Sequence, residues 1–265
     1  MNITKALILA AGNGTRLQRE SSHLPKPLVS VGGMPLLRRV VLNAHQAGIT
    51  HFVVVVGHLG QMVQDHFAQH AIAGVTFEWV VNDEYEKANG VSALKARHTL
   101  SEPFLLTMAD HIFDAQTAYQ LLQYPVGAGD VVLGVDRKLH CIFDIDDATK
   151  VRLSGEWIVD IGKSLTEYDA IDTGLFLCHP ALFEALQASL RDGDCSLSDG
   201  IRYLAAQRRA RAFDIQDAQW FDIDTPEAIQ HAEAHLNGLA VRPIQSRHSA
   251  DSACGAPSAA TRAAQ

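Results

Sequence analysis

The stretch that most constrains the fold lies at the N-terminus, where an unbroken run of small and apolar residues follows Lys5 and continues to Ala11. Such a run predicts a strand of a parallel sheet that is buried on both faces. Gly12 and Gly14 follow the run directly. Glycines let a backbone approach a ligand closely and point successive N–H groups into one concavity. The stretch therefore predicts an α/β fold whose first strand ends in an anion-binding loop.

Two basic residues follow this loop at positions suited to phosphate binding. Arg16 has a planar guanidinium that can bind two phosphate oxygens at once, and Lys26 supplies a compact charge between Pro25 and Pro27. A strand, a glycine loop, an Arg and a Lys in this order predict a nucleoside triphosphate site. The alternative is an ordinary glycine turn, which is common after buried strands in α/β proteins.

Strand and helix patterns alternate through the N-terminal half of the chain. The pattern predicts helices after Pro35 and over residues 59–70, and strands over residues 51–56, 76–81 and 104–109. This order is typical of a parallel sheet covered by helices. Residues 136–175 instead show β-hairpin patterns. We expect a Rossmann-like fold with a mixed, mostly parallel central sheet and a small β-hairpin region that binds the acceptor substrate.

Composition narrows the range of functions. The chain has 265 residues and a formal net charge of -8, which argues against a partner that is a nucleic acid or an anionic membrane. No apolar run reaches the roughly 18 residues of a membrane span, so we expect no membrane insertion. The four cysteines form no C-x-x-C motif, which favours a reducing compartment and a cytoplasmic location. We expect one domain over residues 1–240 and a disordered tail over residues 241–265.

Carboxylates stand where a metal-dependent nucleotide enzyme needs them. Asp110 ends an apolar strand, and ligands bind at the carboxyl ends of strands in sheets of this type. Asp222 and Asp224 alternate along an extended segment, so one of them is expected to face the cleft. Two acids that bind an octahedral Mg²⁺ beside phosphate oxygens suit this chemistry. His111 is either a substrate contact or a structural histidine, and no residue pattern suggests a covalent nucleophile.

Several motifs resemble those of the sugar-phosphate nucleotidyltransferase family. The pattern L-x-x-A-A-G-x-G-T-R-L…P-K-P begins at Leu7, and the similarity continues through Asp110, Asp172-Thr-Gly174 and Trp220-Phe-Asp-Ile-Asp-Thr-Pro-Glu. Within the family, the chain is most similar to inositol-1-phosphate cytidylyltransferases. The pieces that support this are Glu86-x-x-Asn-Gly-x-Ser92, Thr107-Met-Ala-Asp-His111, Asp147-Ala-Thr-Lys-Val-Arg152 and Ile161-Gly-Lys163.

The resemblance implies a Mg²⁺-dependent reaction in which CTP and a polyol phosphate, inositol 1-phosphate above all, give a CDP-linked product and pyrophosphate. It implies catalytic roles for Arg16, Lys26 and Asp110, with Mg²⁺ held by Asp110 and Asp224. The nucleotide would contact Ala10, Ala11, Gly12, Asn13, Gly14, Thr15, Arg16, Lys26, Asn89, Gly90 and Ser92. The acceptor would contact His111, Lys150, Lys163, Glu167, Asp172 and Gly174.

Three other interpretations stay open to different degrees. The same fold could use UTP or dTTP with glucose 1-phosphate, or the chain could be a catalytically silent nucleotide-binding subunit. A Rossmann dehydrogenase is disfavoured because the loop lacks the G-x-G-x-x-G spacing and the second strand ends in Gly57-His58 instead of an acid. The oligomeric state is open, a homo-oligomer included. The polar tail predicts that any following enzyme of the pathway is a separate chain, although archaeal members of the subgroup carry a fused membrane-embedded domain.

Overall fold

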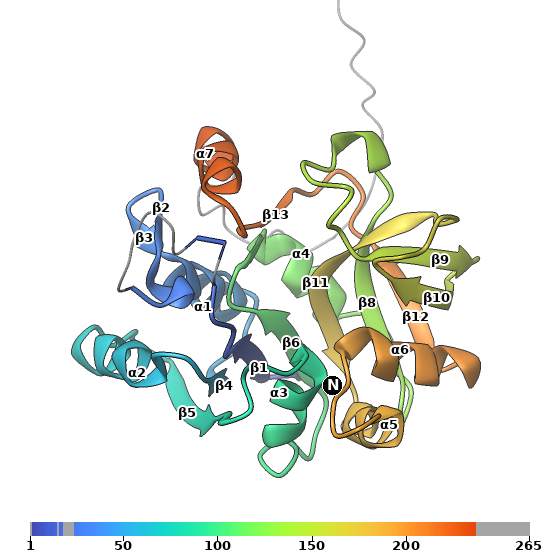
Figure 1. Ribbon diagram of the computed structural model, residues 1–265, viewed down its shortest axis with the longest axis horizontal. Helices are drawn as coiled ribbons and strands as arrows, with labels where there is room; N and C mark the ends of the chain where they lie inside the picture. Colours follow the sequence, from blue (N-terminus) through green and yellow to red (C-terminus); the bar gives the residue numbers. More distant parts are fainter. Residues whose placement is uncertain (1, 15, 18–23, 237–265) are drawn as a thin grey trace, which may run out of the picture.

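The computed structural model describes residues 2–14, 16–17 and 24–236 (Figure 1). In this part of the chain, nine strands form one sheet in the order β5-β4-β1-β6-β11-β8-β12-β10-β9. Their bounds are β1 (Lys5–Ala10), β4 (His51–Val56), β5 (Thr76–Val81), β6 (Phe104–Met108), β8 (Val131–Asp136), β9 (Lys150–Ser154), β10 (Trp157–Gly162), β11 (Ala170–Cys178) and β12 (Ala210–Asp214). Thr15 and the predicted tail over residues 241–265 lie outside the described residues.

The sheet is mixed, as expected, but parallel pairing is confined to its first part and to the β8–β12 pair. Strands β5, β4, β1 and β6 run parallel to one another. β11 then pairs antiparallel with both β6 and β8. Because β9 pairs with β10 and also with β11, the strands β11, β8, β12, β10 and β9 close into a small barrel-like ring. The predicted hairpin region thus forms part of the main sheet.

Helices cover both faces of the sheet. Within the described residues the α-helices are α1 (Leu36–Gln46), α2 (Gly60–Gln69), α3 (Asn89–Lys95), α4 (Ala115–Leu122), α5 (Ala181–Ser189), α6 (Leu197–Ala206) and α7 (Pro226–His235). Side chains of β1 alternate between two cores, with Leu7 in the core that contains residues of α3, α5 and α6, and Ile8 in the core that contains residues of α1, α2 and α4. This two-sided burial explains why β1 is a continuous apolar run.

Two short ribbons lie outside the main sheet. β2 (Ser30–Val31) pairs with β3 (Met34–Pro35), and β7 (His111–Phe113) pairs with β13 (Trp220–Asp222). α7 follows β13 and lies apart from the other helices (Figure 1). Its start is fixed locally, because the Thr225 hydroxyl accepts a hydrogen bond from the Ala228 N–H at 3.2 Å and Pro226 occupies the first turn. None of the described helices is long and apolar enough to cross a membrane.

Candidate active site

The glycine loop after β1 brings the backbone against Lys26. Gly14 has a φ of +60°, and a Cβ atom at this position would lie 2.8 Å from the Cβ of Lys26. A residue with a side chain would therefore both strain the backbone and clash with the lysine. Gly12 has open space where its Cβ would be, while Ala10 and Ala11 are buried at the end of the strand. The loop thus combines a close approach to Lys26 with an open surface at Gly12.

Lys26 lies between two of the predicted carboxylates. Its ammonium is 2.5 Å from Asp110 Oδ2 and also forms an ion pair with Asp224 Oδ1. Burial alone would lower the pKa of Lys26, but Asp110 and Asp224 raise it well above its usual value. Burial would raise the pKa of Asp110, but Lys26 and His111 hold it well below its usual range. Lys26 and Asp110 are therefore both ionised at neutral pH, although their side chains are only 11% and 23% exposed.

Arg16 extends the same network. Its guanidinium forms one ion pair with Asp224 Oδ2 and a second, at 2.8 Å, with Asp147 Oδ2. Asp147 lies on the loop between β8 and β9, far from Arg16 in the sequence. The predicted phosphate-binding cations therefore meet carboxylates from both halves of the chain.

His111 is held between two acids. Its Nδ1 atom lies 2.8 Å from Asp110 Oδ1, and its Nε2 atom lies 3.9 Å from Asp222 Oδ2. Burial would lower the pKa of His111, but the carboxylates of Asp222 and Asp110 raise it to about 9. The ring also stacks on Trp220, with 5.9 Å between the centroids. In this arrangement the two carboxylates favour the protonated imidazole, which donates a hydrogen bond to Asp110.

Gly174 provides the space for this histidine. It has a φ of +72°, and a Cβ atom here would lie 2.3 Å from Cδ2 of His111. Asp172 accepts a hydrogen bond from the Gly174 N–H at 2.7 Å, and burial raises the pKa of Asp172 to about 6. The Asp-Thr-Gly motif of β11 therefore shapes the floor of the site around His111.

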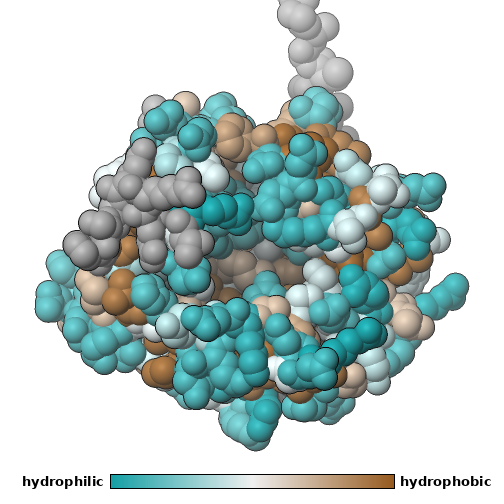
Figure 2. Space-filling model, in the orientation of Figure 1, coloured by the Kyte–Doolittle hydropathy of each residue, from teal (hydrophilic) through white to brown (hydrophobic). Residues whose placement is uncertain are grey.

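A cavity of 660 Å³ begins at these residues and extends toward α7. Figure 2 shows that this face of the molecule is hollowed near its centre and that mainly hydrophilic residues form the rim. Predicted site residues that line the cavity are Asn89, Asp110, His111, Lys163, Asp172, Gly174 and Asp224. Asp222, the alternative to Asp224 in the sequence prediction, lines it as well, and lining residues that were not assigned a role from the sequence include Asp136, Phe143, Asp147 and Trp220.

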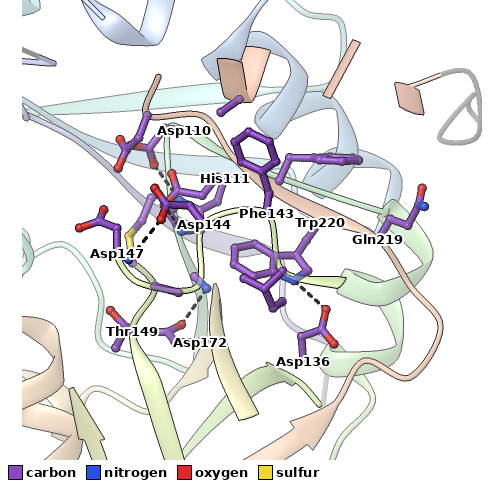
Figure 3. Close-up of a pocket in the computed structure, with 18 of the residues that line it drawn as sticks. Asp110, His111, Asp136, Phe143, Asp144, Asp147, Thr149, Asp172, Gln219 and Trp220 are labelled. Carbon is purple, nitrogen blue, oxygen red and sulfur yellow. Dashed lines mark hydrogen bonds and ion pairs between the residues drawn. The ribbon is translucent and has the colours of Figure 1, made fainter. Parts of the chain in front are cut away.

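Trp220 and Asp136 form a pair inside this cavity (Figure 3). The indole Nε1–H of Trp220 donates a hydrogen bond to Asp136 Oδ2 at 3.0 Å, and Lys138 lies 2.9 Å from Asp136 Oδ1. An aromatic face beside carboxylates is suited to a polyhydroxylated ring, which offers both C–H groups and hydroxyl donors. The sequence could have indicated a site role for Asp136, because this acid stands at the end of a buried apolar strand, as Asp110 does.

The start of α3 forms another wall of the site, and neither Asn89 nor Ser92 caps this helix. The cap position is Ala88, and Asn89 Oδ1 instead accepts a hydrogen bond from the Leu197 N–H at 2.8 Å. Ser92 accepts one from the side chain of the fully buried Asn82 at 2.9 Å. Gly90 is required for close packing, since a Cβ atom there would lie 2.5 Å from the carbonyl oxygen of Cys195. Long-range contacts therefore fix the orientation of this wall.

Two predicted acceptor residues are placed away from the cavity wall. Lys150 is buried, and its ammonium donates a hydrogen bond to the carbonyl oxygen of Asp146 at 2.7 Å. Glu167 is exposed between β10 and β11. Lys150 thus holds the loop that carries Asp147, and the acceptor roles of both residues stay predictions.

The carboxylates of the site suit a hard divalent cation, which binds oxygen ligands. Asp110, Asp222 and Asp224 contribute oxygens to one region, and Asp222 Oδ1 is buried with no hydrogen-bond partner. Asp110, His111 and Asp222 bring one possible ligand atom each within 4.8 Å of one another. The carboxylates of this region supply oxygen ligands, which are the ligands that Mg²⁺ prefers.

The fold and site define a class: an α/β nucleotide-binding domain with cations at the end of β1 and carboxylates at the ends of neighbouring strands. A family model for the MobA-like NTP transferase domain matches residues 6–212. The chain therefore belongs to the MobA-like NTP transferase family.

Similar proteins define a narrower group. The chain is 38% identical over 237 residues to a "Bifunctional IPC transferase and DIPP synthase" of Rubrobacter xylanophilus, which covers 89% of this chain and 52% of the relative. A protein of the same name from Thermococcus kodakarensis is 34% identical, covering 90% of this chain and 52% of the relative. The chain thus spans about half the length of these relatives.

Solved structures show the same fold. The inositol-1-phosphate CTP transferase of T. maritima matches with a TM-score of 0.79 and 24% identity, covering 93% of this chain and 99% of that one. A UDP-glucose pyrophosphorylase complexed with UDP-glucose matches with a TM-score of 0.73 and 20% identity. The match covers 89% of this chain and 99% of that one.

Proposed function

We propose that this chain transfers a cytidylyl group from CTP to inositol 1-phosphate or a related polyol phosphate and releases pyrophosphate. The observation that carries the proposal is the convergence of Lys26, Asp110 and Asp224, the two carboxylates of which line the same cavity as Trp220 and Asp172. The names of the similar proteins, which include IPC transferases and an inositol-1-phosphate CTP transferase, support the choice of nucleotide and acceptor.

In the proposed reaction, a phosphate oxygen of the acceptor attacks the α-phosphorus of CTP. A new P–O bond forms while the bond to the β-phosphate breaks, and pyrophosphate leaves with the electron pair. Transfer of this kind depends on positioning and on stabilisation of charge, so it needs no covalent nucleophile. The chain supplies Lys26 for the α-phosphate, Arg16 and the glycine loop for the remaining phosphates, and Lys163 for the acceptor phosphate.

Mg²⁺ fits the same proposal. Asp110 and Asp224 would hold it, and Asp222 is a further candidate because its Oδ1 atom has no partner. When bound, the metal would neutralise charge on the triphosphate. Lys26 already contacts both Asp110 and Asp224, so it orients these carboxylates for that role.

The cavity wall supports a cyclic polyol as acceptor. Asp172 and the Trp220–Asp136 pair face the same space, and Phe143 lies nearby (Figure 3). Carboxylates accept hydrogen bonds from ring hydroxyls, and the indole face packs against ring C–H groups.

Pyrophosphate release tests the function. The purified protein with Mg²⁺ is assayed with each of four nucleoside triphosphates and a panel of polyol and sugar phosphates. We expect release with CTP and inositol 1-phosphate. Release only with UTP or dTTP and glucose 1-phosphate would refute the cytidylyl assignment. If no combination released pyrophosphate, the result would favour a nucleotide-binding subunit. Lys26→Ala should abolish the signal while Lys95→Ala, which changes a surface lysine, should keep it.

A further inference from the structure

One carboxylate joins the nucleotide side of the cleft to its acceptor side. Asp147 Oδ2 accepts a hydrogen bond from Arg16 Nη1 at 2.8 Å, and Asp147 Oδ1 accepts one from Lys163 Nζ at 2.9 Å. Arg16 follows the glycine loop after β1, whereas Lys163 directly follows β10. Both oxygens of Asp147 are thus engaged by cations that lie 147 positions apart in the chain, by subtraction of their residue numbers.

The loop that carries Asp147 is anchored on two sides. On one side, the buried Lys150 ammonium donates to the Asp146 carbonyl at 2.7 Å, and the Asp172 N–H donates to the Thr149 carbonyl at 2.9 Å. On the other, the Phe143 ring stacks on His231 of α7 with 4.6 Å between the centroids. These contacts therefore fix the position of the loop and of Asp147 within it.

The carboxylate is charged in this position. Partial burial would raise the pKa of Asp147, but the hydrogen bonds from Lys163 and Arg16 hold it below its usual value. A carboxylate that spans two cations with its two oxygens imitates two oxygens of a phosphate group. It carries one negative charge, while a phosphate monoester carries between 1.5 and 2 at neutral pH, about as phosphoserine does.

We propose that Asp147 is a specificity-determining residue that occupies the position of a phosphate group between Arg16 and Lys163, so that an anion binds there only by displacing it. A phosphate monoester can displace the carboxylate because it brings more charge and an additional oxygen to the same two cations. A neutral polyol cannot do so. Asp147 would thereby restrict this part of the cleft to phosphorylated acceptors and to the phosphates of the nucleotide. The inference rests on the proposed function, which assigns phosphate binding to Arg16 and Lys163.

Equilibrium binding of inorganic phosphate and of pyrophosphate tests this inference without any turnover. Calorimetric titrations of the whole protein are made in the absence of divalent metal, with wild type and Asp147→Asn. We expect about fivefold tighter binding of both anions to the variant, because two partly exposed ion pairs no longer compete for the cations.

Asp144→Asn is the matched control. Asp144 lies on the same loop and lines the same cavity, and the substitution removes the same charge. Its side chain accepts a hydrogen bond from the Asp147 N–H at 3.3 Å, which an asparagine oxygen can also accept. We expect less than a twofold change in anion affinity. Equal gains in both variants would mean that general charge, and not displacement of Asp147, causes the effect.

A double variant shows whether the gain passes through the proposed cations. In Asp147→Asn combined with Lys163→Met, the gain in anion affinity should disappear.

Unchanged or weaker anion binding in Asp147→Asn would overturn the inference. Should this variant fold poorly, Asp147→Ser provides a second neutral side chain at this partly exposed position. The failure of this test is separate from failure of the proposed function, because inorganic anions report on Asp147 whichever nucleotide the enzyme uses.

Discussion

Replacement of Lys26 by methionine should destabilise the metal-free protein strongly. The side chain of Lys26 is 11% exposed, and those of its partners Asp110 and Asp224 are each 23% exposed. Methionine keeps most of the volume but leaves two neighbouring carboxylates without their shared cation. Removal of one partner from a buried ion pair costs about 3–5 kcal/mol, and the partial exposure here places the expected loss near the lower value, about 3 kcal/mol.

The loss should depend on pH in a defined direction. The depressed pKa of Asp110 in the wild type means that this group contributes stability above its unfolded pKa, near 3.9, and that this contribution is lost as the pH falls further. In the variant, protonation relieves the repulsion between the two carboxylates. The difference in unfolding free energy should therefore be largest above about pH 6 and shrink toward about pH 4.

Urea denaturation followed by circular dichroism measures this difference at both pH values. Lys95→Met is the matched control, because Lys95 also contacts two carboxylates, Asp83 and Glu84, but at the surface. The control should lose far less stability. Added Mg²⁺ should stabilise Lys26→Met more than wild type, because Asp110 and Asp224 lack the Lys26 ammonium in the variant and gain more from a bound cation. A loss below about 1 kcal/mol, or one equal to that of the control, would contradict the reasoning.

Three further predictions concern the floor of the site and the metal. Gly174→Ala should destabilise the fold by at least about 2 kcal/mol in urea denaturation, because its φ is +72° and the new Cβ would lie 2.3 Å from His111. A loss under about 0.5 kcal/mol would show that the ring moves aside freely. Asp172→Asn should raise stability at pH 8 but not at pH 4, because burial raises the pKa of Asp172 from 3.8 to about 6 and so penalises its charged form. At 1.36 kcal/mol per pKa unit the gain is at most about 3 kcal/mol, and a pH-independent effect would refute this origin. Chelation with EDTA should reduce pyrophosphate release to background, and added Mg²⁺ should restore it; release that persists in EDTA would refute the metal requirement.

Local patterns were sufficient to predict the first half of the fold. The run after Lys5 is apolar at every position because β1 is buried on both faces, and this is visible in the sequence itself. The start of α7 was predictable because Thr225 and Pro226 act locally. Likewise, Asp110 could be placed at the ligand-binding edge because the carboxyl ends of parallel strands meet there.

Contacts between distant segments could not be predicted in this way. The antiparallel entry of β11 between β6 and β8 depends on pairing partners about 70 and 40 residues earlier in the chain. Asn89 did not cap α3 because its side chain bonds to Leu197 instead. No local pattern signals that Asp147 meets Arg16 and Lys163, since each is an ordinary charged residue in its own segment.

Product identity in a competition experiment tests the central claim most directly. The protein is incubated with Mg²⁺, equal concentrations of CTP, UTP, dTTP and ATP, and both inositol 1-phosphate and glucose 1-phosphate, and the products are identified by mass spectrometry. The account predicts CDP-inositol as the dominant product, formed together with pyrophosphate and absent when Asp110→Asn replaces the wild type. A dominant UDP- or dTDP-linked hexose would contradict it.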